Sequence, residues 1–119
     1  MLFLYDPAAE LDNKIRKWLD DNGVTYEARS LTEDRPTAQE ILDWADIGRL
    51  PLRSFWNAEK PSFKMIRLMN NMLFMPRETR AYVLTSDVSF LRHPMLIGEN
   101  FVVLGTNKAE WQKALKIQS

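Results

Sequence analysis

The sequence predicts an α/β fold in which a βαβ unit, a helical middle region and a ββα unit follow one another. Three observations predict it. An apolar strand, an amphipathic helix and a second strand-like segment open the chain, helix signals fill the middle, and two short apolar runs joined by a turn precede a final helix. The expected sheet has four strands and is mixed, because βαβ strands run parallel and a hairpin is antiparallel.

The opening βαβ unit spans the first thirty residues. Met1 to Tyr5 is a short apolar strand that leads through a proline and a turn into an amphipathic helix. The apolar face of that helix consists of Leu11, Ile15, Trp18 and Leu19. We expect the helix to end at Asn22 and Gly23, a pair suited to the left-handed residue that closes a helix. Val24 to Ser30 alternates and predicts a second strand, parallel to the first.

The middle of the chain, about residues 37–88, is predicted to be a helical insertion. Thr37 with Glu40 three residues later is a capping box that begins a short helix ending before Gly48. Residues 50–57 predict a further helical turn, and two prolines at 61 and 76 each begin another helix. The apolar faces are Ile41, Leu42, Trp44 and Ala45, then Phe63, Ile66, Met69 and Leu73, then Tyr82, Val83 and Leu84.

The chain is predicted to close with a hairpin and a helix. Met95 to Ile97 and Phe101 to Leu104 are strands joined by a turn at residues 98–100. The last helix carries Trp111 and Leu115. Since there is no repeat or linker, residues 1–119 are expected to form a single domain.

Composition narrows the function classes. The 119 residues, 45% of them hydrophobic, suffice for one core, and 16 basic residues balance 16 acidic ones. This balance does not indicate nucleic acid or an anionic membrane as a direct partner. No apolar run has the length of a membrane span and no signal peptide is recognisable, so we expect a cytoplasmic protein. The absence of cysteine excludes disulfides and thiol chemistry carried by the chain itself.

Tyr5 to Leu19 has the layout of a segment that carries the nucleophile of a thiol enzyme, although it contains no sulfur. A helix N-terminus just past a strand end presents N–H groups and the positive end of the helix dipole, which favour a thiolate or an oxyanion. The residues at this spot are Ala8, Ala9, Glu10 and Asp12. Alanine cannot attack a substrate, and two carboxylates would repel an anion. The pattern therefore indicates a fold without its usual reaction.

Several segments match one protein family in register: Tyr5 and Pro7 with Lys17–Leu19, GVTYEAR at 23–29, LPLRSFWN at 50–57, Ser86 with Asp87, LRHPMLI at 91–97 and VLGTNKAEW at 103–111. Through these segments the chain resembles the arsenate reductase (ArsC) and Spx family over nearly its whole length. The resemblance implies a thioredoxin-like fold with a helical insertion. It also implies a cis peptide bond before Pro94, facing the first helix.

The resemblance breaks down where the family's chemistry lies. The nucleophilic cysteine of relatives falls on Ala9, and the second cysteine of redox-switch relatives falls on Asp12. Two arginines that hold the oxyanion in relatives fall on His93 and on or near Trp56. These changes together indicate a loss of arsenate reduction and thiol redox chemistry rather than a change of specificity. Trp56 either joins the core, like the other tryptophans, or plugs the anion site.

The residues around His93 leave two interpretations open. With Asp6, Glu10 and Asp12 this histidine could bind a divalent metal or form an acid–base pair. Alternatively, the carboxylates are an acidic helix start, with His93 hydrogen-bonded to one of them. We expect the second arrangement, with no metal and no cofactor. If Asp6 is the N-cap and Pro7 the first helical residue, the helix begins early and replaces the active-site loop of relatives.

The basic and methionine-rich residues of the insertion also have two interpretations. Arg49, Arg53, Lys60, Lys64 and Arg67 form either a solvated surface or a site for an acidic partner, and Met65, Met69, Met72 and Met75 form either core or a partner groove. In Spx relatives the turn before the insertion contacts the C-terminal domain of the RNA polymerase α subunit. Its counterpart here is the surface of Asp46, Gly48, Arg49 and Arg53.

Three functions follow from these expectations. The first is a non-catalytic module that binds or regulates another protein, with the RNA polymerase α subunit as the partner that the resemblance implies. The second is an oxidoreductase-family protein, arsenate reductase-like or glutathione-dependent, that acts on a thiol substrate without a cysteine of its own. The third is a structural protein, or a hydrolase-like site built on His93 and the carboxylates.

Overall fold

The computed structural model describes residues 1–57, 67, 71 and 74–116. In chain order the elements are β1 (Leu2–Tyr5), α1 (Glu10–Asp21), β2 (Glu27–Ser30), α2 (Ala38–Gly48), the 3-10 helix η1 (Leu52–Phe55), α4 (Arg77–Thr85), the 3-10 helix η2 (Val88–Phe90), β3 (Met95–Ile97), β4 (Val102–Leu104) and α5 (Lys108–Leu115). The sheet order is β2-β1-β3-β4, with β1 and β2 parallel and the other pairs antiparallel. The predicted mixed, four-stranded sheet is confirmed.

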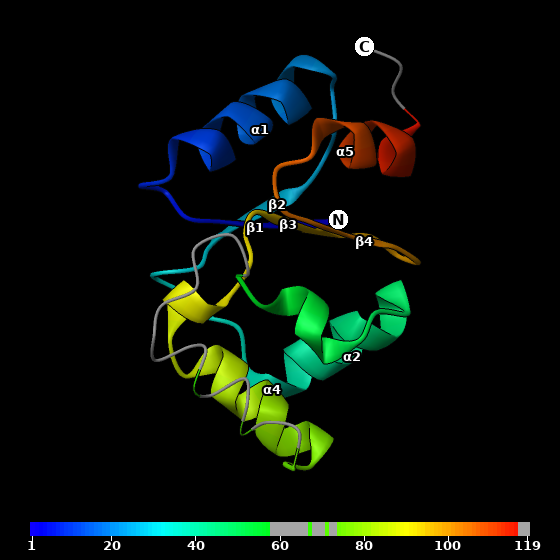
Figure 1. Ribbon diagram of the computed structural model, residues 1–119. Coiled ribbons are helices and arrows are strands. Elements are labelled where there is room, and N and C mark those ends of the chain that lie inside the picture. The colour runs from blue at the N-terminus through cyan, green and yellow to red at the C-terminus, as the bar shows by residue number, and fades with distance from the viewer. Residues whose placement is uncertain (58–66, 68–70, 72–73, 117–119) are drawn as a thin grey trace.

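The sheet separates two layers of helices, as Figure 1 shows, with α1 and α5 on one face and α2 and α4 on the other. Side chains alternate along a strand, so Phe3 faces α1 and α5 while Leu4 faces the insertion. The core beneath α1 and α5 consists of Phe3, Ile15, Leu19, Leu96, Val103 and Trp111. The larger core on the other face includes Leu4, Ile41, Trp44, Phe55, Leu84 and Met95.

Two predicted apolar faces are partly wrong. Leu11 is 56% exposed, because the inward stripe of α1 runs through Asp12, Ile15 and Leu19 instead. Tyr82 on α4 is 69% exposed, since Ala81 and Leu84 form the buried face of that helix.

The four tryptophans differ in burial. Trp44 and Trp111 are buried, as expected for core residues. Trp18 is only partly buried at the edge of the smaller core. Trp56 is buried on the insertion side of the sheet, where its ring lies 5.5 Å from that of Phe90.

The first helix begins late, at Glu10, so the early start at Pro7 is wrong. The carboxylate of Asp6 accepts the N–H of Ala8 at 2.9 Å, and the Asp6 carbonyl accepts the N–H of Ala9 at 3.0 Å. These bonds close a turn before the helix, and Ala9 becomes its N-cap. The loop between β1 and α1 is therefore present, as in the alternative that the sequence left open.

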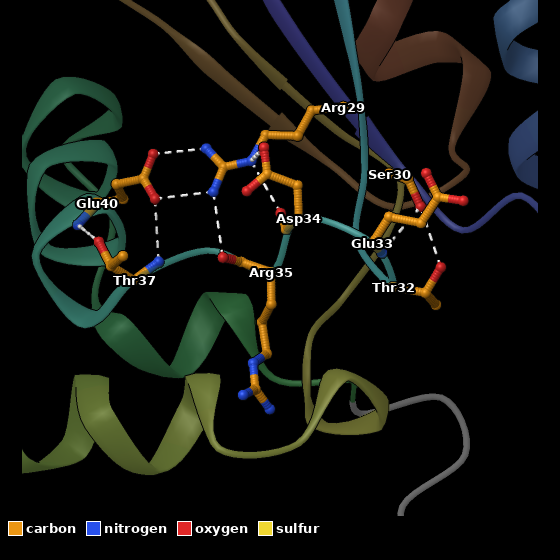
Figure 2. Close-up of polar contacts among 8 residues, drawn as sticks. All are labelled: Arg29, Ser30, Thr32, Glu33, Asp34, Arg35, Thr37 and Glu40. Atoms are coloured by element: carbon orange, nitrogen blue, oxygen red, sulfur yellow. Dashed lines mark hydrogen bonds and ion pairs between the residues drawn. The ribbon is translucent and has the colours of Figure 1, made fainter.

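An ion pair between Arg29 and Glu40 joins α2 to the edge strand β2. The guanidinium of Arg29 donates to both carboxylate oxygens of Glu40, at 2.6 and 2.9 Å (Figure 2). The predicted capping box is confirmed, because Thr37 and Glu40 exchange side chain to backbone bonds. Hydrogen bonds from Arg29, opposed by burial and aided by the Thr37 backbone, lower the pKa of Glu40.

The remaining elements follow the predicted order. The hairpin and the last helix are confirmed, and the N–H of Gly98 donates to Phe101 across the hairpin turn at 2.9 Å. Of the helix expected after Pro61, Arg67 and Asn71 are described, and both are helical and exposed, whereas Lys60, Lys64, Met65, Met69 and Met72 lie outside the described residues. Within residues 1–57, 67, 71 and 74–116, no helix is long and apolar enough to cross a membrane.

Candidate functional site at the start of the first helix

A buried carboxylate occupies the first turn of α1. Asp12 is 1% exposed, and its Oδ2 lies 2.9 Å from the backbone N–H of Asp6 and 2.7 Å from Nδ1 of His93. The N-cap just before this turn is Ala9, whose side chain is a methyl group. At the point where a thiol enzyme would present sulfur, this chain therefore presents the methyl group of Ala9. Three residues further on is the carboxylate of Asp12, which is already hydrogen-bonded.

His93 reaches Asp12 from the loop before β3. The His93–Pro94 peptide bond is cis, as the family resemblance implied. The loop is fixed to the insertion by two backbone bonds of 2.8 Å, from Arg92 N to Phe55 O and from Asn57 N to Phe90 O. Because the Asp12 carboxylate contacts Nδ1, it sets the orientation of the imidazole ring, which keeps 22% of its surface exposed.

A pocket of about 360 Å³ opens between the start of α1 and the His93 loop. Its lining residues are Ala9, Glu10, Leu11, Asp12, Asn57, Arg92, His93, Gly105 and Thr106. Three of the four positions where the family's functional residues were expected thus meet in one pocket. Trp56 is not among the residues that line it. Its burial with Phe90 favours the core interpretation of this side chain over the plug.

Of the four residues Asp6, Glu10, Asp12 and His93, the last three line the pocket, but their side chains have different partners. Asp6 closes its own turn, and Glu10 lies 3.5 Å from Lys14 on the exposed side of the helix. In the described part of the chain, no group of three or more histidine and carboxylate side chains is arranged to hold a metal ion. The arrangement fits the acidic helix start, in which one carboxylate holds His93.

The sequence does not single out the polar pocket residues Asn57, Arg92 and Thr106. They lie in segments that match the family, at 50–57, 91–97 and 103–111, but no pattern marks their side chains as members of a site. The Arg92 guanidinium packs over the backbone of Gly105, where a Cβ would lie 2.7 Å from Arg92 Nε. Gly105 has φ of +87°, so a glycine serves both the backbone conformation and the close approach.

The turn that was expected to form a partner surface is tied to its neighbours. Asp46 forms an ion pair with Arg77 of α4, with 2.9 Å between Oδ1 and Nη2. Gly48 packs against β4, since a Cβ there would lie 3.0 Å from the Cβ of Val102. Arg49 closes α2 in the left-handed conformation and is exposed, and Arg53 of η1, four positions further on, is also exposed.

Comparisons with known proteins agree with this fold. No family model matches the chain. A crystal structure described as an ArsC family related protein from Bacteroides fragilis is 30% identical, covers 94% of both chains and has a TM-score of 0.80. A possible arsenate reductase from Streptococcus mutans is 22% identical over 95% of both chains, with a TM-score of 0.78. An arsenate reductase from Vibrio cholerae is 11% identical, over 98% of this chain and 96% of that one, with a TM-score of 0.77.

A similar sequence is the uncharacterized protein YusI of Bacillus subtilis, 20% identical over 113 residues, which are 95% of this chain and 96% of that protein. The fold and these similarities together define a thioredoxin-like protein related to the arsenate reductases. The chain belongs to the ArsC family. With no cysteine in its 119 residues, it is a cysteine-less member.

Proposed function

We propose that this chain is a non-catalytic ArsC-family module that binds or regulates another protein and has lost arsenate reduction and thiol redox chemistry. One observation carries the proposal. Ala9 caps α1 where a nucleophile would stand, and the carboxylate of Asp12 lies buried in the first turn, bound to His93. Covalent thiol chemistry needs a sulfur atom and an anion-stabilising site at this point. A methyl group supplies neither, and a carboxylate disfavours an approaching anion.

A turnover assay tests the loss of chemistry. Purified protein is incubated with arsenate, glutathione, glutaredoxin, glutathione reductase and NADPH, with a cysteine-containing arsenate reductase as positive control. We expect NADPH oxidation at the rate of the protein-free blank. A rate well above the blank that disappears in His93→Ala would overturn the proposal, because it would show that the pocket still performs a reaction.

The candidate partner, by family resemblance, is the C-terminal domain of the RNA polymerase α subunit. The surface that would meet it is that of Asp46, Gly48, Arg49 and Arg53, of which the two arginines are exposed and basic. Titration of the purified α domain into ¹⁵N-labelled protein should shift the amides of Arg49 and Arg53, and Arg53→Glu should abolish the shifts. A titration without shifts removes this partner, while the proposed loss of chemistry is judged by the turnover assay alone.

A second candidate function is binding of a thiol substrate such as glutathione. The observation in its favour is the pocket of about 360 Å³, which lies between Ala9 and His93 and is lined by the basic Arg92. In this case the reacting sulfur atoms would all belong to other molecules. Titration with glutathione at millimolar concentration should then shift the amides of Ala9 and His93. Unchanged spectra would remove this function.

A further inference from the structure

The strand β4 has an outer edge whose backbone groups face away from the sheet. β4 is the last strand in the order β2-β1-β3-β4 and, among the described residues, pairs only with β3 (Figure 1). Two hydrogen bonds of 2.9 Å, from Gly98 N to Phe101 O and from Gly105 N to Pro94 O, show which residues of this strand direct their backbone groups toward β3. Because inward and outward pairing alternates along an antiparallel strand, the N–H and C=O groups of the intervening even-numbered residues point outward.

These outward residues are Val102 and Leu104. In the part of the chain that the structure describes, no backbone hydrogen bond from outside the β3–β4 ladder reaches either of them. Their outward N–H and C=O groups match the spacing of another antiparallel strand. An edge with this pattern is a template for a further strand unless another segment covers it.

A groove of about 500 Å³ runs along this edge, and we call it the β4-edge groove. Leu50 and Ser54, which follow α2, line one side, and Lys113 and Ala114 of α5 line the other. Arg92 lies at the end near Leu104, because Pro94 bonds to Gly105 just past that end of β4. The floor is apolar, so the groove offers a strand both backbone partners and contacts for alternate side chains.

The charges in the groove favour an acidic ligand. Two cations, Arg92 and Lys113, line it together with one acid, Glu110. Neither cation has an ion pair within the described residues. Packing over Gly105 holds the Arg92 guanidinium at the end of the groove. A carboxylate placed there would meet a planar donor group suited to a bidentate contact.

We propose that the β4-edge groove binds an extended segment of a partner protein, which adds to β4 as an antiparallel strand and places an acidic side chain against Arg92 and Lys113. This inference rests on the proposed protein-binding function and adds to it a second surface, separate from that of Asp46, Gly48, Arg49 and Arg53, together with the chemistry of the segment that binds there. The backbone of Val102 and Leu104 supplies the affinity, and the two cations select the acidic side chain.

Two labelled octapeptides serve as probes, both alternating threonine and valine, one with a central glutamate and the other with lysine at that position. Fluorescence anisotropy at low ionic strength should show the glutamate peptide binding roughly fivefold more tightly or better, with the preference reduced at about 0.5 M salt. In ¹⁵N-labelled protein, the amides of Val102 and Leu104 should shift on binding. Equal affinities, or shifts confined to other surfaces, would overturn the proposal.

Two variants test separately how the backbone of β4 and the charges of the groove contribute to peptide binding. Val102→Pro deletes an outward N–H while the inward ladder to β3 stays intact, and it should abolish binding of both peptides. Lys113→Glu, on the exposed side of α5, should reverse the preference between the peptides and leave the fold unchanged. Lys17→Glu on α1 is the matched charge control and should change nothing. Wild-type binding by both Val102→Pro and Lys113→Glu would refute strand addition at this edge.

Size-exclusion chromatography distinguishes the partner segment from a second copy of this chain. We expect a monomer that binds the glutamate peptide. A dimer that Val102→Pro converts to a monomer would show that β4 pairs with itself, which would overturn the assignment of a partner segment. If neither the peptides nor self-association involve the groove, the inference fails, while binding of a partner through Arg49 and Arg53 would still support the proposed function.

Discussion

Asp12 Oδ2 and His93 Nδ1 lie 2.7 Å apart, although 81 positions separate the two residues in the chain. The contact joins the first turn of α1 to the loop that ends in the cis peptide bond before Pro94. The same Oδ2 accepts the N–H of Asp6. One buried carboxylate thereby joins three segments around the pocket, and at the start of α1 it disfavours an approaching anion.

Asp12→Ala should destabilise the protein by about 2 kcal/mol, because the N–H of Asp6 would lose its acceptor and Nδ1 of His93 would lose its hydrogen-bond partner. Asp12→Asn keeps one acceptor oxygen and should cost roughly half as much. Urea unfolding followed by fluorescence measures both free energies. Glu10→Ala in the same helical turn is exposed and serves as the control. If Asp12→Ala were as stable as wild type, the carboxylate would not be the fixing element described above.

Ala9→Cys should produce a thiol that reacts more slowly than the helix start alone would allow. The N-terminus of α1 favours a thiolate, but the carboxylate of Asp12 one turn further on disfavours a second negative charge. Adding Asp12→Asn to Ala9→Cys should therefore speed alkylation by iodoacetamide at pH 7 by roughly three- to tenfold. Thr79→Cys on α4 is the control, and its rate should not respond to Asp12→Asn. Identical rates for Ala9→Cys with and without Asp12→Asn would show that Asp12 does not oppose an anion here.

The Arg29–Glu40 ion pair should make the free energy of unfolding depend on pH in the acidic range. The pKa of Glu40 is lowered in the folded state, chiefly by hydrogen bonds from Arg29. The stabilisation that ionised Glu40 provides is therefore present above its pKa in the unfolded chain, about 4.3, and is lost as the pH falls through its lower pKa in the folded protein. Glu40→Gln should cost about 1 kcal/mol at pH 7, since the pair is partly exposed, and the difference from wild type should shrink toward about pH 2.

Urea unfolding between pH 7 and pH 2 measures this difference. Glu33→Gln is the matched control, because Glu33 lies in the adjoining loop, where its backbone N–H donates to Oγ of Ser30 and is kept in the variant. This change should stay within about 0.5 kcal/mol of wild type at neutral pH. If the difference in free energy of unfolding between wild type and Glu40→Gln does not vary with pH, the Arg29–Glu40 ion pair is not the source of the stabilisation.

The fold could be predicted from the sequence because its signals are local. The capping box of Thr37 and Glu40, the closing pair Asn22 and Gly23, and the turn at Gly98 each act within a few residues. The start of α1 does not follow from local signals alone, since Asp6 and Pro7 also suit a helix start. There the side chain of Asp6 bonds to Ala8 in a turn, and helix formation is delayed to Glu10.

The site could be predicted only in part, because its chemistry depends on contacts across the chain. The resemblance placed Ala9, Asp12 and His93 together, and the pocket brings them together. Periodicity alone, however, put Leu11 inside and gave no reason to bury Asp12, whose burial depends on partners at Asp6 and His93. The position of Arg92 over Gly105 depends on strand register, for which single residues carry no signal.

Gly105 and Gly23 should respond differently to alanine, although both have positive φ, of +87° and +68°. Left-handed backbone should cost each variant about 1–2 kcal/mol. A Cβ at Gly23 meets nothing within 4 Å, whereas one at Gly105 would lie 2.7 Å from Nε of Arg92 and would displace its guanidinium. The Arg92 Nε–Hε resonance should therefore move only in Gly105→Ala.

In an Arg92→Ala background, Gly105→Ala should lower the free energy of unfolding by about 0.5–1 kcal/mol less than it does in wild type, as a double-mutant cycle by urea unfolding measures. Equal costs in both backgrounds would show that Gly105 does not hold Arg92 at the end of the β4-edge groove.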